Sequence, residues 1–410
     1  MTETIQKEPQ QEEKDTEEKK EAKGTGYWDD LSQKGKRDAE IKERLDEIRI
    51  EAKTKLFSSE LTQEDFESDV IPDLRSQVKS ILDPYDLPQE EATRRVDEVI
   101  TEKSELFKYV QMNAYGEIAF NSYQAYKIFD GLKSSIYEGE FKLRPDKIEL
   151  RFMDPQRIQL TEITFTTSTY RFFREGTVAV NFDDLARLLK TSKSEKAIST
   201  IIFTETGLKI TKQSTELNIP INDTISSLDL EFEEIPMETL LSLKYPFTFA
   251  LRKEQFEYIL KHTDIHSEIL GIEVSPERLE FGQHGQVGTR NIPLEKQDLE
   301  DFSFDPTLLA TENPEDNAEN EDREEQNPLP HEALASYSLA YLKFVAKMIY
   351  LLDKKDTFMF HMKTDHPLLV EITLPLNHIG KGEVGTFSIR NFIACRDRDG
   401  DIDDDGLEEF

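Results

Sequence analysis

The chain has 410 residues, with 84 acidic residues against 51 basic ones and a formal net charge of −33. This length allows two or three domains with cores of their own, and the acidic balance argues against a histone-like or repressor-like DNA binder. The single cysteine, Cys395, excludes an intrachain disulfide and a CxxC metal site, which fits a reducing cytosolic compartment. No apolar run approaches the roughly 18–20 residues that span a bilayer, and Met1–Lys23 lacks the pattern of a secretory signal.

The N-terminal quarter of the chain is predicted to be a tail followed by helices. Residues 1–26 have the high charge and low hydrophobicity of a disordered acidic tail. Over residues 27–114, apolar residues recur at three- and four-residue spacing, as at Ile41, Leu45 and Ile48. We therefore expect a helical N-terminal extension, with a solvated acidic spacer as the alternative.

Residues 115–222 change to alternating strands and short helices, which predicts a first domain. The expected helices are Tyr123–Lys133 and Phe182–Lys190, because apolar residues recur on one face of each. The expected strands are Tyr115–Phe120, Phe141–Leu143, Lys147–Phe152, Ile158–Phe165, Thr177–Asn181, Ile198–Phe203, Gly207–Thr211 and Glu216–Ile221.

A connector over residues 223–243 leads to a second domain, residues 244–396, that repeats this order. Its expected helices are Glu254–Lys261 and Ala340–Leu351. An insertion over residues 297–332 is rich in Asp, Glu, Asn and Pro and predicts an acidic loop, and residues 397–410 predict an acidic tail. The expected strands are Phe247–Leu251, Ile269–Val274, Arg278–Phe281, Gly288–Leu294, Ala335–Leu339, Thr357–Met362, Leu368–Leu374 and Gly385–Ile393. The fold class is therefore α+β, with one strand–helix plan laid down twice.

Basic residues recur on all four predicted helices of an otherwise anionic chain. This pattern indicates one surface kept for a polyanion while the rest of the protein repels it. For any one of these cations, an ordinary solvated helix face is an equally good explanation. Their recurrence on every helix favours the functional reading.

Four ordered segments resemble sliding clamps of the proliferating cell nuclear antigen type. They are Met153–Leu160 (MDPQRIQL), Val180–Lys190 (VNFDDLARLLK), Ser338–Phe344 (SLAYLKF) and His366–Glu371 (HPLLVE), and the resemblance covers residues 115–396. It implies a two-domain DNA clamp whose helices line a ring and whose β-sheets lie outside. The N-terminal extension and the acidic insertion lie outside the family pattern.

The resemblance also implies a non-enzymatic function without a cofactor. Such a processivity factor encircles double-stranded DNA as a trimer, without sequence specificity, and tethers DNA polymerase and other replication or repair enzymes; a clamp loader opens the ring. The positions that match the family's hole-lining cations are Lys127, Lys133, Arg187, Lys190, Lys261, Lys343 and Lys347. Tyr258 stands where the family often has another basic residue.

A second working surface implied by the resemblance is an apolar pocket for short partner motifs. Its matching residues are Met153, Ile158, Leu160, Ile235, Pro236, Leu240, Pro367, Phe392, Ile393 and Ala394. Core packing is the alternative for any one of them, and Cys395 replaces a residue that is usually proline at the pocket rim. Family subunits pair through edge strands, here Glu216–Ile221 and Gly288–Leu294. A homotrimer and a heterotrimeric ring of specialised paralogues, for repair or checkpoint use, are both compatible with the sequence.

Several apparent motifs carry no chemistry. His262 and His266 are four residues apart but lack a carboxylate partner, and Gly282, Gly285 and Gly288 lie between strands without a GK[ST] ending. The acidic segment Asp397–Gly406 cannot place both the glycine and the closing Glu of a calcium loop. A DNA-modifying enzyme would need clustered acidic metal ligands, and a purely structural acidic scaffold would need no cationic face. We expect a chain with no membrane partner, cytoplasmic in a prokaryote or nuclear in a eukaryote.

Overall fold

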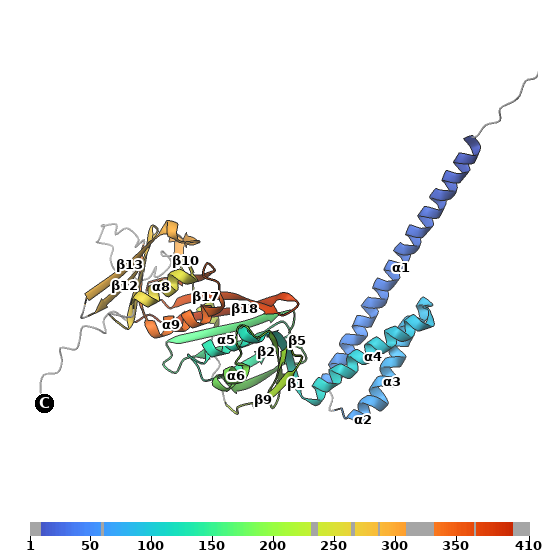
Figure 1. The fold of residues 1–410 in the computed structure, drawn as a ribbon, viewed down its shortest axis with the longest axis horizontal. Coiled ribbons are helices and arrows are strands. Elements are labelled where there is room, and N and C mark those ends of the chain that lie inside the picture. Colours follow the sequence, from blue (N-terminus) through green and yellow to red (C-terminus); the bar gives the residue numbers. More distant parts are fainter. Residues whose placement is uncertain are drawn as a thin grey trace, which may run out of the picture. The chain divides into compact units, whose positions relative to one another are not determined.

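In the computed structural model the described residues are 10–58, 61–230, 237–263, 267–285, 288–308, 332–364 and 366–396. They belong to two compact units, Met1–Met112 and Asn113–Phe410 (Figure 1). Among these residues, no helix is both long enough and apolar enough to cross a lipid bilayer.

The N-terminal unit is helical, as the apolar spacing predicts, and it has a core. Its elements are α1 (Gln10–Ser58), α2 (Gln63–Asp65), a π-helical turn (Phe66–Val70), α3 (Ile71–Leu82), a 3₁₀ turn (Asp83–Tyr85) and α4 (Gln89–Gln111). Ile41 of α1, Val78 of α3 and Val99 of α4 are fully buried against one another's helices. Phe66 stacks on Phe107, with ring centroids 4.1 Å apart. A solvated spacer would bury no such core.

The expectation of a disordered tail over residues 1–26 is wrong from Gln10 onward, because α1 begins there. Low hydrophobicity shows that a segment cannot build a core, but it does not stop helix formation. Glu, Lys and Gln are good helix formers, and this segment consists largely of them. Residues 1–9 lie outside the described part of the chain.

The second unit contains two halves with the same order of elements. The first half comprises β1 (Ala114–Asn121), α5 (Ser122–Leu132), β2 (Glu138–Leu143), β3 (Ile148–Met153), β4 (Gln159–Thr167), β5 (Arg171–Phe172), β6 (Gly176–Asn181), α6 (Phe182–Leu189), β7 (Ala197–Thr204), β8 (Gly207–Ser214) and β9 (Pro220–Ser226). After α7 (Met237–Leu241), the second comprises β10 (Phe247–Arg252), α8 (Lys253–Thr263), β11 (Ile269–Val274), β12 (Arg278–Gly285), β13 (Gly288–Glu295), β14 (Phe302–Phe304), β15 (Ala333–Ser338), α9 (Leu339–Met348), β16 (Thr357–Met362), β17 (Leu368–His378) and β18 (Gly382–Ile393). Short 3₁₀ turns follow β13, β14 and α9, at Lys296–Asp298, Pro306–Leu308 and Ile349–Leu351.

The sheets repeat in the same way as the elements. The order β5-β1-β7-β8-β9 in the first half matches β14-β10-β16-β17-β18 in the second, and β4-β3-β2-β6 matches β13-β12-β11-β15. The halves are joined by antiparallel pairing of β18 with β4, so one nine-stranded sheet runs through both. This leaves β9 and β13 as edge strands of the two remaining sheets. The predicted α+β class and the strand–helix plan laid down twice are confirmed.

The structure also differs from the expected elements in the strand β9, the connector and the acidic loop. Strand β9 runs to Ser226, and its expected first residues form a turn in which Asn218 has a φ of 53°, so the pairing edge begins and ends later than predicted. The connector contains the short helix α7. Phe302–Phe304 of the expected acidic loop is a strand that pairs with β10, because its phenylalanines pack against Phe247. The rest of that loop, residues 309–331, and the tail at 397–410 lie outside the described residues.

Candidate nucleic-acid interface and partner pocket

The four helices of the second unit form one layer. Helix α6 lies beside α5, α5 beside α9, and α9 beside α8 (Figure 1). Each helix buries one apolar face against the sheets, through residues such as Phe129, Leu185, Phe256 and Leu342. The opposite faces of all four helices are therefore left on the same side of the sheets, and the seven predicted cations lie on them.

Side-chain caps fix where the first two helices begin. The Asn121 side chain accepts hydrogen bonds from the backbone amides of Tyr123 and Gln124 at the start of α5. The side chain of Asn181 does the same for Asp183 and Asp184 at the start of α6. Both caps satisfy free amide groups at a helix N-terminus. Asn121 ends β1 and Asn181 ends β6, so each helix starts directly after a strand.

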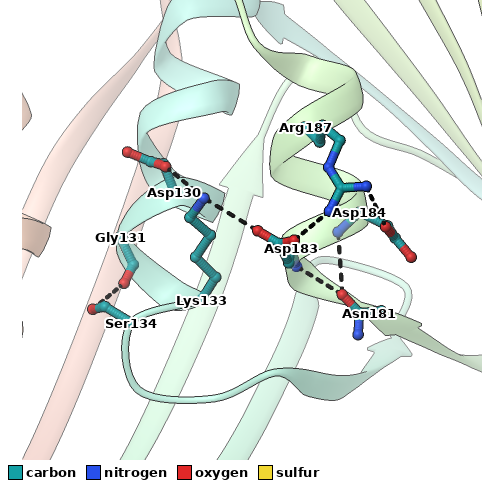
Figure 2. A network of polar contacts seen from close by, with 8 residues as sticks. All are labelled: Asp130, Gly131, Lys133, Ser134, Asn181, Asp183, Asp184 and Arg187. Atoms are coloured by element: carbon teal, nitrogen blue, oxygen red, sulfur yellow. Dashed lines mark hydrogen bonds and ion pairs between the residues drawn. The ribbon is translucent and has the colours of Figure 1, made fainter.

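Two predicted cations are paired with carboxylates where α5 meets α6 (Figure 2). The Lys133 Nζ atom lies 3.1 Å from a carboxylate oxygen of Asp130 and 3.3 Å from one of Asp183. Arg187 lies 2.6 Å from Asp183 and 3.5 Å from Asp184. The hydrogen bond to Asp130 is the main cause of the raised pKa of Lys133, and the bond from Arg187 is the main cause of the lowered pKa of Asp183. This corner of the layer is therefore compensated in charge.

The positive excess lies on the two central helices. Helix α9 carries Lys343 and Lys347 and no acidic residue. Lys127 projects from α5, and the Lys190 and Lys261 side chains are exposed at the ends of α6 and α8. All seven predicted cations are thus on one layer, but those at the α5–α6 corner are held by carboxylates.

Tyrosine rings lie close to Lys127. The Lys127 Nζ atom lies 4.6 Å from the ring centroid of Tyr350 and 5.0 Å from that of Tyr126. The hydroxyl of Tyr123 lies 3.4 Å from that of Tyr350, and burial is the main reason that the pKa of Tyr123 rises to about 12. Tyr350 was not predicted as a functional residue, although its position three residues after Lys347 on a helical path was a signal for it.

A second apolar cluster lies at the connector between the halves. Leu160, Met237 and Phe392 are buried together, and Met153 and Leu240 pack against them with parts of their surfaces exposed. Four of these residues were predicted for the partner pocket. Met237 and Leu369, which also packs there, were missed, although both lie within three residues of a predicted member. This cluster is called the connector cluster below.

Asp154 fixes the turn beside the connector cluster. Its carboxylate accepts hydrogen bonds from the backbone amides of Gln156, Ile158 and Gln159. It also accepts one from the Tyr341 hydroxyl of α9, at 2.6 Å. This arrangement holds Arg157 in a left-handed conformation, with a φ of 58°, and ties the turn to the second half. Burial, followed by the bond to Asp154, raises the pKa of Tyr341 to about 12.

The other predicted pocket residues are placed differently. Ile393 packs in the main core rather than in the connector cluster, because successive residues of a strand point to opposite faces. The Ile158 carbonyl accepts a hydrogen bond from the Ala394 amide at 2.8 Å, so these two residues form a backbone joint. Pro367 is partly exposed just before β17. Ile235 and Pro236 lie outside the described residues.

Comparisons with known proteins point to one family. Residues 119–238 match the family model of the N-terminal domain of proliferating cell nuclear antigen. The DNA polymerase sliding clamp of Pyrococcus furiosus is 28% identical over 127 residues, which are 29% of this chain and 51% of that protein. The clamp of Thermococcus gammatolerans is 23% identical over 260 residues, or 60% of this chain and 90% of that protein. The first match thus spans about half of the relative's length, and the second nearly all of it.

Solved structures show the same fold. The PCNA structure from Thermococcus kodakaraensis superposes with a TM-score of 0.55 at 18% identity, covering 68% of this chain and all of that one. PCNA from Entamoeba histolytica gives 0.53 at 16% identity, with 69% and 100% covered. The PCNA2–PCNA3 complex from Sulfolobus tokodaii gives 0.53 at 19% identity, with 68% and 99% covered.

Proposed function

Because the chain belongs to the proliferating cell nuclear antigen family of sliding clamps, we propose that it encircles duplex DNA as a trimeric ring and tethers DNA polymerase to it. Other replication and repair enzymes and a clamp loader are the further partners. The single observation that carries this proposal is the one layer of helices that bears all seven predicted cations of a chain with a net charge of −33.

Charge explains how such a layer would work. Lys127, Lys190, Lys261, Lys343 and Lys347 would face the phosphates, while the acidic remainder of the chain repels DNA. Contacts of this kind read no sequence and weaken as salt rises, because they act by releasing counterions. The clamp is non-catalytic and resides where the DNA is, in the cytoplasm of a prokaryote or the nucleus of a eukaryote.

The internal joint between the halves supplies a template for ring closure. In that joint, Ile389 of β18 lies opposite Ile163 of β4, and Asn391 opposite Thr161. Strands β17 and β18 of the second half correspond to β8 and β9 of the first. Val370 of β17 pairs with Asn391 of β18, and Ile210 of β8 pairs with Asp223 of β9, so Asp223 is the counterpart of Asn391.

The other edge follows in the same way. Strands β3 and β4 correspond to β12 and β13. Leu150 of β3 pairs with Ile163 of β4, and Phe281 of β12 pairs with Ile292 of β13. Ile292 is therefore the counterpart of Ile163, and Arg290 is the counterpart of Thr161. A β9–β13 joint in this register sets Ile221 against Ile292 and Asp223 against Arg290 of a second copy. Both pairs are complementary, and Ile221 is 49% exposed in the single chain. The two edges of one chain thus suit each other, which supports a homotrimer.

The connector cluster would receive the partner proteins. Met153 and Leu240 leave part of an apolar surface open beside buried Leu160 and Phe392, and the Asp154 turn holds one wall in place. An apolar site that is largely formed in advance suits aromatic and aliphatic anchors of a short peptide. The pocket assignment rests on this chemistry and on the family.

Two measurements on one set of variants test the proposal. Light scattering should give three times the 47.6 kDa chain mass. The double variant Lys190→Glu, Lys347→Glu should keep that mass but lose duplex binding at low salt, and Lys381→Glu at an exposed turn should lose little. A trimer whose duplex affinity is the same in all three proteins would overturn the DNA assignment. A monomer would overturn self-closure and point to a heteromeric ring.

A further inference from the structure

The exposed large apolar side chains of residues 113–396 fall into two groups. Among the described residues, the aliphatic ones lie before or on edge strand β9 and around the connector: Leu217, Ile219, Ile221, Leu230 and Leu241. The aromatic ones are Tyr137, Tyr258 and Tyr350, with 74%, 60% and 50% of their surfaces exposed. Tyr258 lies on α8 and Tyr350 in the turn that directly follows α9, while Tyr137 lies between α5 and β2. Edge pairing and the connector explain the first group but not the second.

Two of these tyrosines line a cavity together with three lysines. The cavity has a volume of about 430 Å³, and its walls include Tyr137, Tyr350, Lys127, Lys133 and Lys347. Sites for small ligands usually measure about 300–1,000 Å³, so a single nucleotide is of suitable size. The cavity extends from the charge-compensated corner of α5 and α6, with Asp130, Lys133 and Asp183, to Lys347 and Tyr350 at the end of α9.

The charges of this cavity leave two lysines for a ligand. Lys133 is engaged by Asp130 and Asp183. The Lys127 ammonium group lies over tyrosine rings, and neither Lys127 nor Lys347 forms an ion pair with a described residue. Phosphate binding could therefore draw on both without breaking a salt bridge.

The backbone holds both rings at the cavity. The Tyr137 carbonyl accepts a hydrogen bond from the Phe182 amide at 2.7 Å. The Tyr350 carbonyl accepts one from Nζ of the buried Lys253, also at 2.7 Å. The Tyr350 ring already has the Lys127 ammonium group near it, whereas the more exposed Tyr137 ring has no aromatic or cationic partner among the described residues. Tyr137 is thus the ring available for stacking.

Duplex DNA offers no free base face to an exposed aromatic ring, because its bases are already stacked and paired. Single strands, in contrast, are bound by cations that follow the phosphates and by aromatic rings that stack on the bases. We propose that this cavity binds an unpaired nucleotide, with its base on Tyr137 and its phosphate between Lys127 and Lys347. The inference rests on the proposed function, because it needs the helix layer to face DNA. The nucleotide could be free or part of a strand.

The test measures binding of three ligands to the intact protein by fluorescence. The ligands are a fluorescent oligo(dT), a blunt duplex of equal length and a fluorescent mononucleotide. Tyr137→Ala should weaken oligo(dT) binding roughly tenfold, because it removes the ring on which the base would stack, and Tyr137→Phe should restore it. Tyr258→Ala, an exposed aromatic outside the cavity, is the matched control and should bind like the parent.

The outcomes separate this inference from the proposed function. Duplex affinity should be the same in the parent and in Tyr137→Ala. Equal oligo(dT) binding by both proteins, with salt-sensitive duplex binding intact, overturns the nucleotide site alone. If the parent protein binds neither the duplex nor oligo(dT), the clamp function is overturned as well. Mononucleotide binding that depends on Tyr137 as strongly as oligo(dT) binding assigns the site to free nucleotides, whereas strand binding alone assigns it to unpaired DNA.

Discussion

At the scale of single residues, Asp154 holds the most connected position near the connector cluster. Its carboxylate joins the amides of its own turn to a tyrosine of the other half, so one side chain fixes both local conformation and the contact between halves. It is also buried, with 5% of its surface exposed. Removing it would leave the buried Gln159 amide and the part-buried amides of Gln156 and Ile158 without this acceptor, while the Tyr341 hydroxyl would keep its 3.1 Å bond to the Gln156 side chain. A desolvated donor without an acceptor costs more than the bond itself contributes.

We expect Asp154→Ala to lower the free energy of unfolding by about 1–3 kcal/mol, because the donors it leaves behind stay desolvated. Urea unfolding followed by circular dichroism measures the change. Gln156→Ala keeps the carboxylate and removes only an exposed 3.1 Å bond from the Tyr341 hydroxyl, so this control should change stability by less than about 0.5 kcal/mol. Equal effects of the two substitutions would show that the turn is not held by the carboxylate.

At the scale of elements, a ladder of charges crosses the sheet face opposite the helices. It runs from Arg151 to Glu162, Arg390, Glu371 and His361, with successive distances of 2.8, 3.5, 3.1 and 3.1 Å. These residues come from five neighbouring strands, and the contact between Glu162 and Arg390 bridges the joint between the halves. A single exposed pair contributes little, but a network across one joint holds several strands in one register.

The ladder predicts an acid-sensitive joint. The hydrogen bond from His361 is the main cause of the lowered pKa of Glu371. A carboxyl whose folded-state pKa is lowered stabilises the fold above its ordinary value of 4.5, and this contribution is lost as pH falls through the folded-state pKa. Glu371→Gln should therefore flatten the fall in melting temperature below about pH 4.5. Glu383→Gln, at an exposed position, should leave the parent's pH profile unchanged.

At the scale of the whole molecule, the proposed assembly depends on two edges of the same chain. The register taken from the internal joint sets Asp223 of one copy against Arg290 of the next. In the single chain, Arg290 donates a hydrogen bond to the carbonyl of His262 at the end of α8, so its position at the edge is already fixed.

A charge swap should test this register. Asp223→Arg should weaken the trimer, and adding Arg290→Asp should recover part of the loss, with a coupling free energy of about 0.5–3 kcal/mol. Sedimentation at several protein concentrations measures the association constant. Asp229→Arg, exposed and outside the edge strand, is the control. A double variant that associates no better than Asp223→Arg alone would reject the pairing.

The sequence predicted most of the fold because its elements carry strong local signals. Apolar periodicity marks α5 and α6, and both begin at an asparagine that caps the helix. Strand β14 was missed because it is only three residues long and lies beside an acidic loop. The disordered tail was a wrong prediction because composition reports the lack of a core, not the lack of a helix.

The candidate sites were harder to predict because they depend on distant neighbours. Nothing local to Lys133 shows that Asp183, fifty positions away, lies 3.3 Å from it. The burial of Ile393 in the main core could have been foreseen, since its neighbour Phe392 faces the connector cluster on the alternate side of β18. The remaining predicted cations and pocket residues stay predictions.

The register taken from the β18–β4 pairing also sets two prolines opposite each other at the outer edges. Inside the chain, Thr164 and Ser388 face each other across the joint, and both carry an amide proton. Their counterparts at the outer edges are Pro293 and Pro220, which have none. The proposed pairing between copies would therefore lack two backbone donors that the pairing within a copy has, and it would also lack the ladder of charges. If the chain closes into the proposed ring, mechanical force should separate the β9–β13 pairing between chains before it separates the β18–β4 pairing within a chain.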